Sequence, residues 1–271
     1  MGMNITNVLL VVMYKTSLSD SVTVQSIINY IRPQSSEKVS GYRLVIWDNS
    51  PSADIADLER LYSLLPALDV RYVRTPENCP LSKIYNKVVS GLVETEYLTL
   101  LDQDSILLED YFMELRKAQV EGHPLILPQV MCGGILVSPG ERFFCKGKLL
   151  RGVTPGRISS KNLLAINSGI SAMGEVFKMI PYDDRLKFYG TDTYFMKQYE
   201  KHFPYAYVLN AKLEHSLAEN DISTSVERKQ QIAQARQEAW AIVFTETLAE
   251  RIFLYAYQRA LQFSRWLKKV S

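Results

Sequence analysis

The chain has 271 residues, of which 47% are hydrophobic and 22% are charged, and its formal net charge is +2. These values exclude a disordered chain and predict no nucleic-acid partner. Its three cysteines cannot all pair with one another, and none has the spacing of zinc ligands, which favours a reducing, cytoplasmic location. No apolar run reaches the length of a membrane span.

The first part of the chain alternates between apolar, strand-like runs and amphipathic helical patterns. Because continuous apolar strands alternate with helices, the pattern predicts an α/β fold whose parallel sheet has helices on both faces. Sheets of this kind bind ligands at the carboxyl ends of their strands. The predicted strands are 7–14, 42–50, 69–74 and 96–104, and the predicted helices are 19–31, 53–65 and 81–92.

The second half is less regular. Strands are predicted at 124–130, 133–140, 163–173 and 206–216, and the basic, Gly- and Pro-containing segment 141–162 is predicted to be a mobile loop. From about Ser225 the pattern is helical to the end. We therefore expect a domain at 1–220, with a donor half at about 1–105 and an acceptor half at about 106–220, followed by a C-terminal helical extension at 221–271.

The segment "YLTLLDQDS", residues 97–105, ends an apolar run with two aspartates. On a strand, Asp102 and Asp104 project to one side, where two carboxylates repel each other unless a cation lies near them. A hard divalent cation such as Mg²⁺ prefers carboxylate oxygens. The same letters also fit a strand, a capping turn and a helix, so the pattern alone leaves both interpretations open. Asp48 and Asn49 lie at the carboxyl end of another predicted strand, 42–50, and we expect them to share one crevice with the two aspartates.

Further segments occur in a characteristic order between about residues 7 and 216. They are "LLVVMY", "VIWDNSPSAD", "ENCPLSKIYNKVVSG", "LTLLDQDS", "NSGISAMGEVF", "PYDDRLKFYGTDTYF" and "KLEHS". Together they resemble the family 2 inverting glycosyltransferases of the GT-A fold, especially the rhamnosyltransferase-like enzymes of bacterial surface polysaccharide assembly. The glutamine of "DQD" is a form common among rhamnosyltransferases.

The resemblance implies a nucleotide-binding half with a mixed central sheet. It also implies inverting transfer of a sugar, rhamnose in the rhamnosyltransferase-like case, from a UDP- or dTDP-linked donor. The acceptor would be a hydroxyl of a saccharide or a lipid-linked saccharide, in the assembly of O-antigen (lipopolysaccharide) or capsule-type polysaccharide. The cofactor would be Mg²⁺ or Mn²⁺.

The resemblance further implies a role for individual residues. Asp192 would be the catalytic base, and Asp104 and His215 would bind the metal. The other implied residues are Tyr14, Asp48, Asn49, Asn78 and Asp102 at the donor nucleotide, and Ser168, Gly169, Asp183 and Asp184 on the acceptor side. Each assignment has a structural alternative, such as a helix-entry turn for Asp48, a helix cap for Asp192 or a lone buried histidine for His215.

The C-terminal segment is basic and aromatic. From Arg251 to Ser271 there are five basic residues and no acidic residue. A helix of this composition can lie on the anionic inner face of the cytoplasmic membrane, or pack on the catalytic domain or on another subunit. The sequence leaves these alternatives open, and with them the formation of a homo-oligomer.

Other classes of protein fit the sequence less well. A phosphatase of the haloacid dehalogenase type carries Asp-x-Asp on its first strand, whereas here the motif lies on the fourth predicted strand. A dinucleotide oxidoreductase needs a glycine-rich turn after the first strand, and "MYKTSLSD" contains no glycine. A non-catalytic sugar-nucleotide-binding relative of the same fold stays open, and turnover of the donor would separate it from an enzyme.

Overall fold

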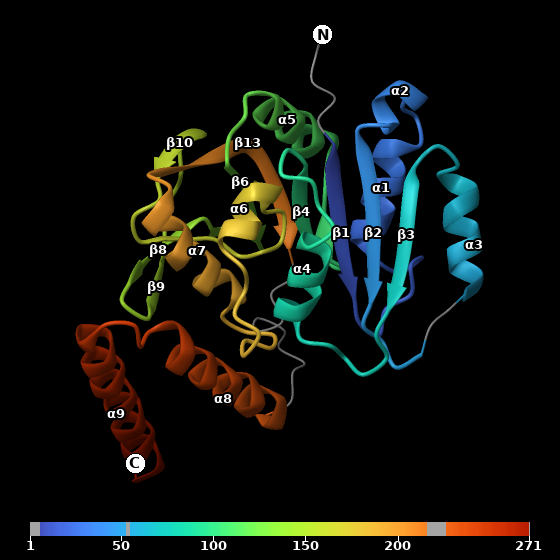
Figure 1. Cartoon of the computed structure of the whole chain (residues 1–271). Helices are drawn as coiled ribbons and strands as arrows, with labels where there is room; N and C mark the ends of the chain where they lie inside the picture. The colour runs from blue at the N-terminus through green and yellow to red at the C-terminus, as the bar shows by residue number, and fades with distance from the viewer. Residues whose placement is uncertain (1–5, 53–54, 216–225, 271) are drawn as a thin grey trace.

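The computed structural model describes residues 6–52, 55–215 and 226–270, which form a curved sheet flanked by helices, with a helical pair at the C-terminus (Figure 1). The helices are α1 Val22–Ile31, α2 Ser36–Val39, α3 Ile55–Leu64, α4 Leu81–Val89, α5 Glu109–Val120, α6 Gly174–Met179, α7 Thr191–His202, α8 Val226–Val243 and α9 Leu248–Val270. The predicted helices are present, and the short helices α2 and α6 and the longer helices α5 and α7 occur in addition.

The main sheet is mixed. Its order is β10-β13-β6-β12-β4-β1-β2-β3; β4, β1, β2 and β3 run parallel, whereas β12 is antiparallel to both β4 and β6. The parallel half confirms the pattern of the first hundred residues, and the antiparallel strand makes the whole sheet mixed, as the family resemblance implies. The strands are β1 Asn7–Met13, β2 Tyr42–Asp48, β3 Asp69–Arg74, β4 Tyr97–Asp102, β5 Ser105–Ile106, β6 Leu125–Cys132, β7 Ile135–Ser138, β8 Gly140–Phe143, β9 Lys146–Leu149, β10 Gly156–Ser159, β11 Leu163–Leu164, β12 Ser171–Met173 and β13 Tyr205–His215.

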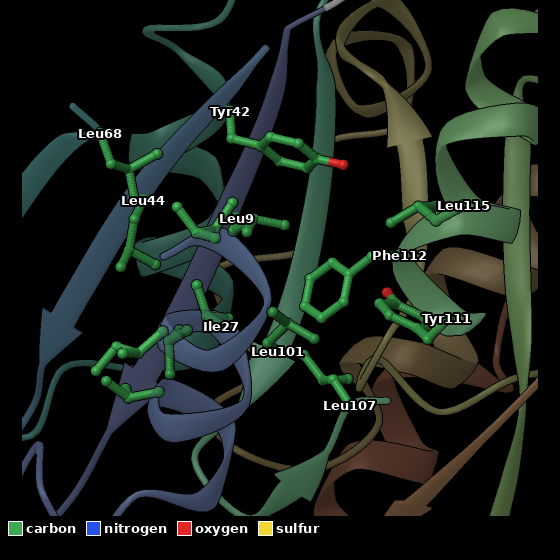
Figure 2. Close-up of a cluster of buried hydrophobic side chains, with 14 of the residues drawn as sticks. Leu9, Ile27, Tyr42, Leu44, Leu68, Leu101, Leu107, Tyr111, Phe112 and Leu115 are labelled. Carbon is green, nitrogen blue, oxygen red and sulfur yellow. The ribbon is translucent and has the colours of Figure 1, made fainter. Parts of the chain in front are cut away.

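Helices cover both faces of this sheet because its central strands are apolar on both sides. Every residue of β1 is buried, and its side chains alternate between two cores. Leu9 and Val11 face the core formed with α1, α3 and α5, which Figure 2 shows around Phe112 and Leu101. Val8 and Leu10 face the core formed with α4, α6 and α7. The two layers hold the carboxyl ends of β1, β2 and β4 at one edge.

The prediction of a mobile loop at 141–162 is wrong. This segment contains β8 and β9, which form an antiparallel hairpin, and β10, which joins the main sheet. Remote residues hold it: Arg142 forms an ion pair with Glu200 of α7, and the ring of Phe144 stacks on Phe253 of α9 at 4.4 Å. The basic residues of this segment indicated a solvated loop, but one of them, Arg142, forms an ion pair with a helix that is distant in the sequence.

The single strand predicted at 163–173 is also wrong. The segment divides into β11, in a small sheet with β8 and β9, and β12, in the main sheet. Gly169 lies between them with φ +84°, and a Cβ there would stand 2.7 Å from Pro128 Cγ and 2.8 Å from Leu213 Cδ1. Only glycine fits this positive φ and this close approach, so the chain turns here rather than continuing as a strand.

The helical C-terminus is confirmed, and its helices occupy different places. The α8 helix crosses below the edge toward which the parallel strands point, and α9 extends away from the sheet (Figure 1). Phe253 and Tyr257 of α9 pack against the β8–β9 hairpin and α8. Within the described ranges, no helix combines the length and the apolar composition needed to cross a membrane.

Candidate active site

Two aspartates and a histidine meet at the carboxyl edge of the sheet. Asp102 ends β4, Asp104 lies in the turn that follows, and His215 ends β13. His215 Nδ1 lies 3.3 Å from Asp104 Oδ1, and His215 Nε2 lies 3.8 Å from Asp102 Oδ2. The pairing of β5 with β13, in which Ser105 opposes His215, brings these distant parts of the chain together. The expected proximity of the two aspartates is confirmed, although the predicted strand extends two residues too far at its carboxyl end and a turn, not strand alternation, orients Asp104.

A buried serine pair supports this cluster from behind. The Oγ of Ser105 lies 3.0 Å from His215 Nδ1 and 2.6 Å from the Oγ of Ser168, which accepts a hydrogen bond from the Asp102 N–H. Both serines are buried. In the tautomer whose Nδ1 carries the proton, Ser105 or Asp104 can accept from that N–H, and the Nε2 lone pair is then available to a ligand.

Ser168 and Gly169 were predicted on the acceptor side. The structure places both behind the end of β4: Ser168 is only 1% exposed, and the Gly169 N–H donates to the carbonyl of Leu100. They hold the strand that carries Asp102, so any effect on an acceptor would pass through that strand.

The electrostatics of the cluster favour a cation. Burial raises the pKa of Asp102 to about 6; the positive form of His215 lowers it, and Asp104 raises it. Burial also raises the pKa of Asp104. One ligand atom from each of Asp102, Asp104 and His215 fits within a group whose members all lie within 4.8 Å of one another. Two carboxylates and an imidazole at this spacing fit Mg²⁺ or Mn²⁺, whose charge would offset the repulsion of the carboxylates.

Asp48 lies at the same edge but on the other face of the sheet. It ends β2, and its carboxylate accepts hydrogen bonds from the hydroxyl of Tyr72 and from the Ser50 N–H. With Lys15 and Tyr72 it lines a cavity of about 430 Å³. Asp102 and Asp104 line a second cavity, of about 480 Å³, together with Asn49. The expected single crevice is divided into two cavities, which share no lining residue among the described ones but are bordered by the consecutive residues Asp48 and Asn49. Nothing in the sequence pattern indicated Tyr72.

Asn49 and Asn78 tie two loops together beside the second cavity. The Asn49 amide donates to Asn78 Oδ1 and to the Cys79 carbonyl, and it accepts from the Thr75 hydroxyl and the Cys79 N–H. Its whole hydrogen-bonding capacity is therefore used inside the protein. Asn78 adopts a positive φ of 53°. Both Asn78 and Tyr14 line the cavity. Asn49 positions this loop, and Asn78 and Tyr14 face the space that it borders.

Asp192 borders a third cavity, of about 420 Å³, which it shares with Asp102 and His215. It lies in the first turn of α7, where its carboxylate accepts a hydrogen bond from the Thr193 N–H at 2.6 Å. Burial raises its pKa, and the Thr193 hydrogen bonds partly oppose this rise. A carboxylate with a raised pKa in a cleft is a candidate for proton transfer.

Asp183 and Asp184 lie just before α7 and bond to the protein. Asp183 forms a bidentate ion pair with Arg185, whose hydrogen bonds lower the Asp183 pKa. Asp184 accepts from the side chain of Asn86 on α4, which also bonds the backbone of Tyr182. The observed contacts hold the loop before Asp192 onto α4, and contact with an acceptor stays a prediction.

Helix α8 contributes a wall that the sequence analysis missed. Gln231, Ile232 and Ala235 border the second cavity, and Arg236 and Trp240 border the third. Residues 231, 232, 235, 236 and 239 recur at the spacing of one helix face. That periodicity was a usable signal, but assignment of this helix to a separate extension concealed its relation to the site.

No protein-family model matches the chain, and no curated protein matches its sequence. Solved structures do match. The chain is similar to S. aureus TarS 1–349, with a TM-score of 0.55 and 11% identity, over 88% of this chain and 81% of that one. It is similar to GalNAc-T7 with UDP, GalNAc and Mn²⁺ (TM-score 0.59, 11% identity), over 85% of this chain and 48% of that one. It is also similar to the mannosyltransferase PcManGT from Pyrobaculum calidifontis with GDP-Man and Mn²⁺. Here the TM-score is 0.57 and the identity 9%, over 87% of this chain and 63% of that one.

These similarities establish the fold. The chain has the GT-A fold of glycosyltransferases, which confirms the predicted fold class. It spans about half the length of GalNAc-T7 and less than two thirds of the mannosyltransferase. The haloacid dehalogenase alternative does not fit this fold, because the two aspartates lie at the end of β4, whereas that class carries them on its first strand.

Proposed function

We propose that this chain is a metal-dependent, inverting glycosyltransferase that moves a sugar from a nucleoside diphosphate to a hydroxyl. The observation that carries the proposal is the cluster of Asp102, Asp104 and His215, which shares a cavity with the Asp192 carboxylate. Such a site combines a place for a metal-bound diphosphate with a base for the acceptor. The GT-A fold and the solved neighbours with bound UDP, UDP-GlcNAc or GDP-Man support it.

The residues divide the chemistry between them. Asp104 and His215 would hold the divalent cation, with Asp102 beside them; when bound, the cation stabilises the negative charge that develops on the leaving diphosphate. Asp192 would accept the proton of the attacking hydroxyl, a task that requires its ionised form. Inversion needs only one such base, and Asp192 lies in the first turn of α7, apart from the metal cluster on β4 and β13.

The nucleoside would occupy the cavity around Asp48. Asp48 would bond the base, and Tyr72 holds the Asp48 carboxylate in place. Lys15 borders the same cavity and brings a positive charge toward a nucleoside diphosphate. We propose UDP or dTDP as the nucleotide; the sequence segments around Asp48 and Asn78 support this choice through the family resemblance.

The finer assignments rest on the same resemblance. We propose membership of family 2, a rhamnose-type donor, and a saccharide or lipid-linked saccharide acceptor in bacterial surface polysaccharide assembly. The Gln103 amide, which favoured rhamnose in the sequence, bonds the backbone of Tyr14. Gln103 also borders the second cavity, but its amide is engaged with Tyr14, so the rhamnose assignment depends on family position.

We further propose that α9 makes peripheral contact with an anionic, inner membrane surface. Ile252, Tyr255 and Phe263 are each about 60% exposed on this helix, and residues 251–271 carry five basic residues and no acidic one. Exposed apolar side chains beside positive charge suit an anionic lipid surface. Flotation with phosphatidylglycerol vesicles tests this; salt-sensitive binding that weakens in Ile252→Ser/Tyr255→Ser is expected, and equal binding of both proteins would contradict it.

Calorimetric titration with UDP and with dTDP, each with and without Mn²⁺, tests the central proposal. Metal-dependent binding of one nucleotide that is lost in Asp104→Ala is expected. The matched control is Asp110→Ala, which removes an exposed aspartate from the first turn of α5. Absence of binding by folded protein would overturn the donor site. Binding without turnover of the corresponding nucleotide sugars would instead favour a non-catalytic relative.

A further inference from the structure

The third cavity lies between the start of α7 and the face of α8. Asp102 and His215 border it at the metal cluster, Asp192 borders it from α7, and Arg236, Ala239 and Trp240 border it from α8. This cavity and the second one share Leu81, Asp102, Phe188, Tyr189 and His215, so the two are continuous beside the metal cluster. A molecule in the third cavity would therefore lie next to whatever occupies the metal site.

Aromatic rings make up much of this lining. Trp240 borders it from α8, Phe188 and Tyr189 border it from the loop before α7, and Tyr85 borders it from α4. Phe188 is 41% exposed, although a ring of this size normally prefers burial. The electron-rich face of an aromatic ring attracts the weakly positive C–H bonds on the apolar face of a sugar ring. Aromatic surface beside a few polar groups is also typical of small-molecule sites.

Trp240 is held in place from behind. Its ring contacts that of Tyr257 on α9 at 5.8 Å, and Tyr257 lies beneath the ammonium group of Lys146 at 4.8 Å. The ring of Phe253 stacks on that of Tyr257 and also on that of Phe144 in the β8–β9 hairpin. The helix α9 and the hairpin thus support a side chain that borders the cavity, which gives the C-terminal helices a part in forming the site.

We propose that this cavity is the acceptor subsite and that it binds a pyranose ring whose apolar face stacks on Trp240. The inference rests on the proposed function and names the substrate class of that site. The acceptor hydroxyl would lie against Asp192. Its oxygen forms the bond to the anomeric carbon of the donor, its proton passes to Asp192, and the electron pair of the broken bond leaves with the diphosphate.

Charge favours a neutral sugar at this position over an anionic group. Among the described residues that border the cavity, Asp102 and Asp192 are acidic and Arg236 is the basic counterpart. The charge of Arg236 lowers the Asp192 pKa, so it favours the ionised base. A phosphate or carboxylate of an acceptor would meet two carboxylates here, whereas sugar hydroxyls can donate hydrogen bonds to them.

Saturation-transfer NMR tests the proposal on the full chain with UDP or dTDP and Mg²⁺ present, because Mg²⁺ is diamagnetic and leaves the signals of the probes sharp. The probes are methyl glycosides of glucose, galactose, N-acetylglucosamine and rhamnose. With the unmodified protein, at least one glycoside should receive saturation on one face of its ring. In Trp240→Ala this saturation should be more than fivefold lower. In Trp240→Phe it should be similar to that of the unmodified protein. The control Tyr62→Leu, which removes an exposed ring on α3, should behave like the unmodified protein.

Calorimetry on the same proteins separates the possible failures. Trp240→Ala should bind nucleotide and Mn²⁺ as the unmodified protein does, which also shows that it is folded. If nucleotide binds but no glycoside is saturated, or if Trp240→Ala is saturated as strongly as the unmodified protein, the acceptor subsite is wrong and the donor site stands. If neither nucleotide binds to the unmodified protein, the proposed function fails first, and this inference fails with it.

Discussion

The side-chain amide of Gln103 forms two hydrogen bonds with the backbone of Tyr14. Gln103 Oε1 accepts from the Tyr14 N–H at 2.7 Å, and Gln103 Nε2 donates to the Tyr14 carbonyl at 3.2 Å. The amide therefore continues the pairing of β4 with β1 by one further link beyond the last paired residues, Asp102 and Val12. This link holds the turn that carries Asp104 against the neighbouring strand end.

Replacement of Gln103 by leucine should loosen that turn. Loss of two partly exposed hydrogen bonds should lower the free energy of unfolding by about 1–2 kcal/mol. Because Asp104 would be less well positioned, Mn²⁺-dependent nucleotide binding should weaken about tenfold. Thermal unfolding and calorimetry measure the two effects, and unchanged nucleotide affinity in Gln103→Leu would contradict this positioning role.

Ser105 should matter for metal affinity although it lies behind the cluster. Its hydroxyl engages His215 Nδ1, and loss of such a partner of a metal-binding histidine typically costs about 10–100-fold in affinity. We expect that loss in Ser105→Ala when Mn²⁺ binding is followed by electron paramagnetic resonance. Ser63→Ala removes an exposed hydroxyl on α3 and serves as the control. Equal Mn²⁺ affinities of the two variants would show that Ser105 does not orient the imidazole.

Asp192→Asn should abolish most sugar transfer while leaving nucleotide binding intact. Loss of a general base reduces the rate by about 10²–10⁴-fold. Because burial raises the pKa of Asp192, the activity of the unmodified protein should fall, as the pH decreases, at a higher pH than an ordinary aspartate would give. Rates across pH measure this. Asp110→Asn, in the first turn of α5, is the matched control. A full rate of transfer in Asp192→Asn would exclude Asp192 as the base.

The same burial predicts an effect on stability with a definite sign. A carboxyl whose folded-state pKa is raised binds protons more strongly in the folded state than in the unfolded chain. Folding stability should therefore decrease as the pH rises from the unfolded pKa through the folded one. Asp192→Asn removes the buried charge, so it should unfold at a higher temperature than the unmodified protein at neutral pH. A lower unfolding temperature would indicate that the Thr193 hydrogen bonds outweigh the cost of burial.

Local pattern predicted the elements of the first half well because each is decided by its own apolar spacing. The stripe on α4 and the apolar run of β1 need no remote partner to be recognised. The position of Asp104 was predicted for the wrong reason: the strand ends at Asp102, and the side chain is aimed by a turn. The neighbouring β5 pairs with β13 through Ser105 and His215, which are 110 residues apart, and no local window contains both.

The missed features depend on contacts between distant segments. Arg142 in the supposed loop is ordered by Glu200, and Phe144 by Phe253. The helix α8 was predicted as a helix, but its place beside the third cavity depends on how α7 holds its far end. Helical period shows which residues share a face, whereas it does not show what that face meets.

Lys197 is the side chain through which α7 holds that end of α8. It is 4% exposed, and its ammonium group lies 2.9 Å from Glu246, 2.8 Å from Glu250 and 2.9 Å from the Val243 carbonyl. Although burial raises the Glu246 pKa, hydrogen bonds from Lys201, Lys197 and Gln198 outweigh it and lower that pKa to about 2. This depressed pKa contributes stability at neutral pH that is lost as the pH falls from the ordinary 4.5 toward 2.

Lys197→Met should therefore destabilise the protein by about 3–5 kcal/mol, because it leaves the largely buried Glu250 without its cation. The control is Lys201→Met, which removes a half-exposed partner of Glu246 and should cost less than about 1 kcal/mol. Denaturant unfolding measures both. Since α8 borders the third cavity, Lys197→Met should also weaken the saturation of glycosides while UDP or dTDP still binds with Mn²⁺. Equal destabilisation by the two substitutions would mean that the buried position of Lys197 adds nothing to the anchoring of α8.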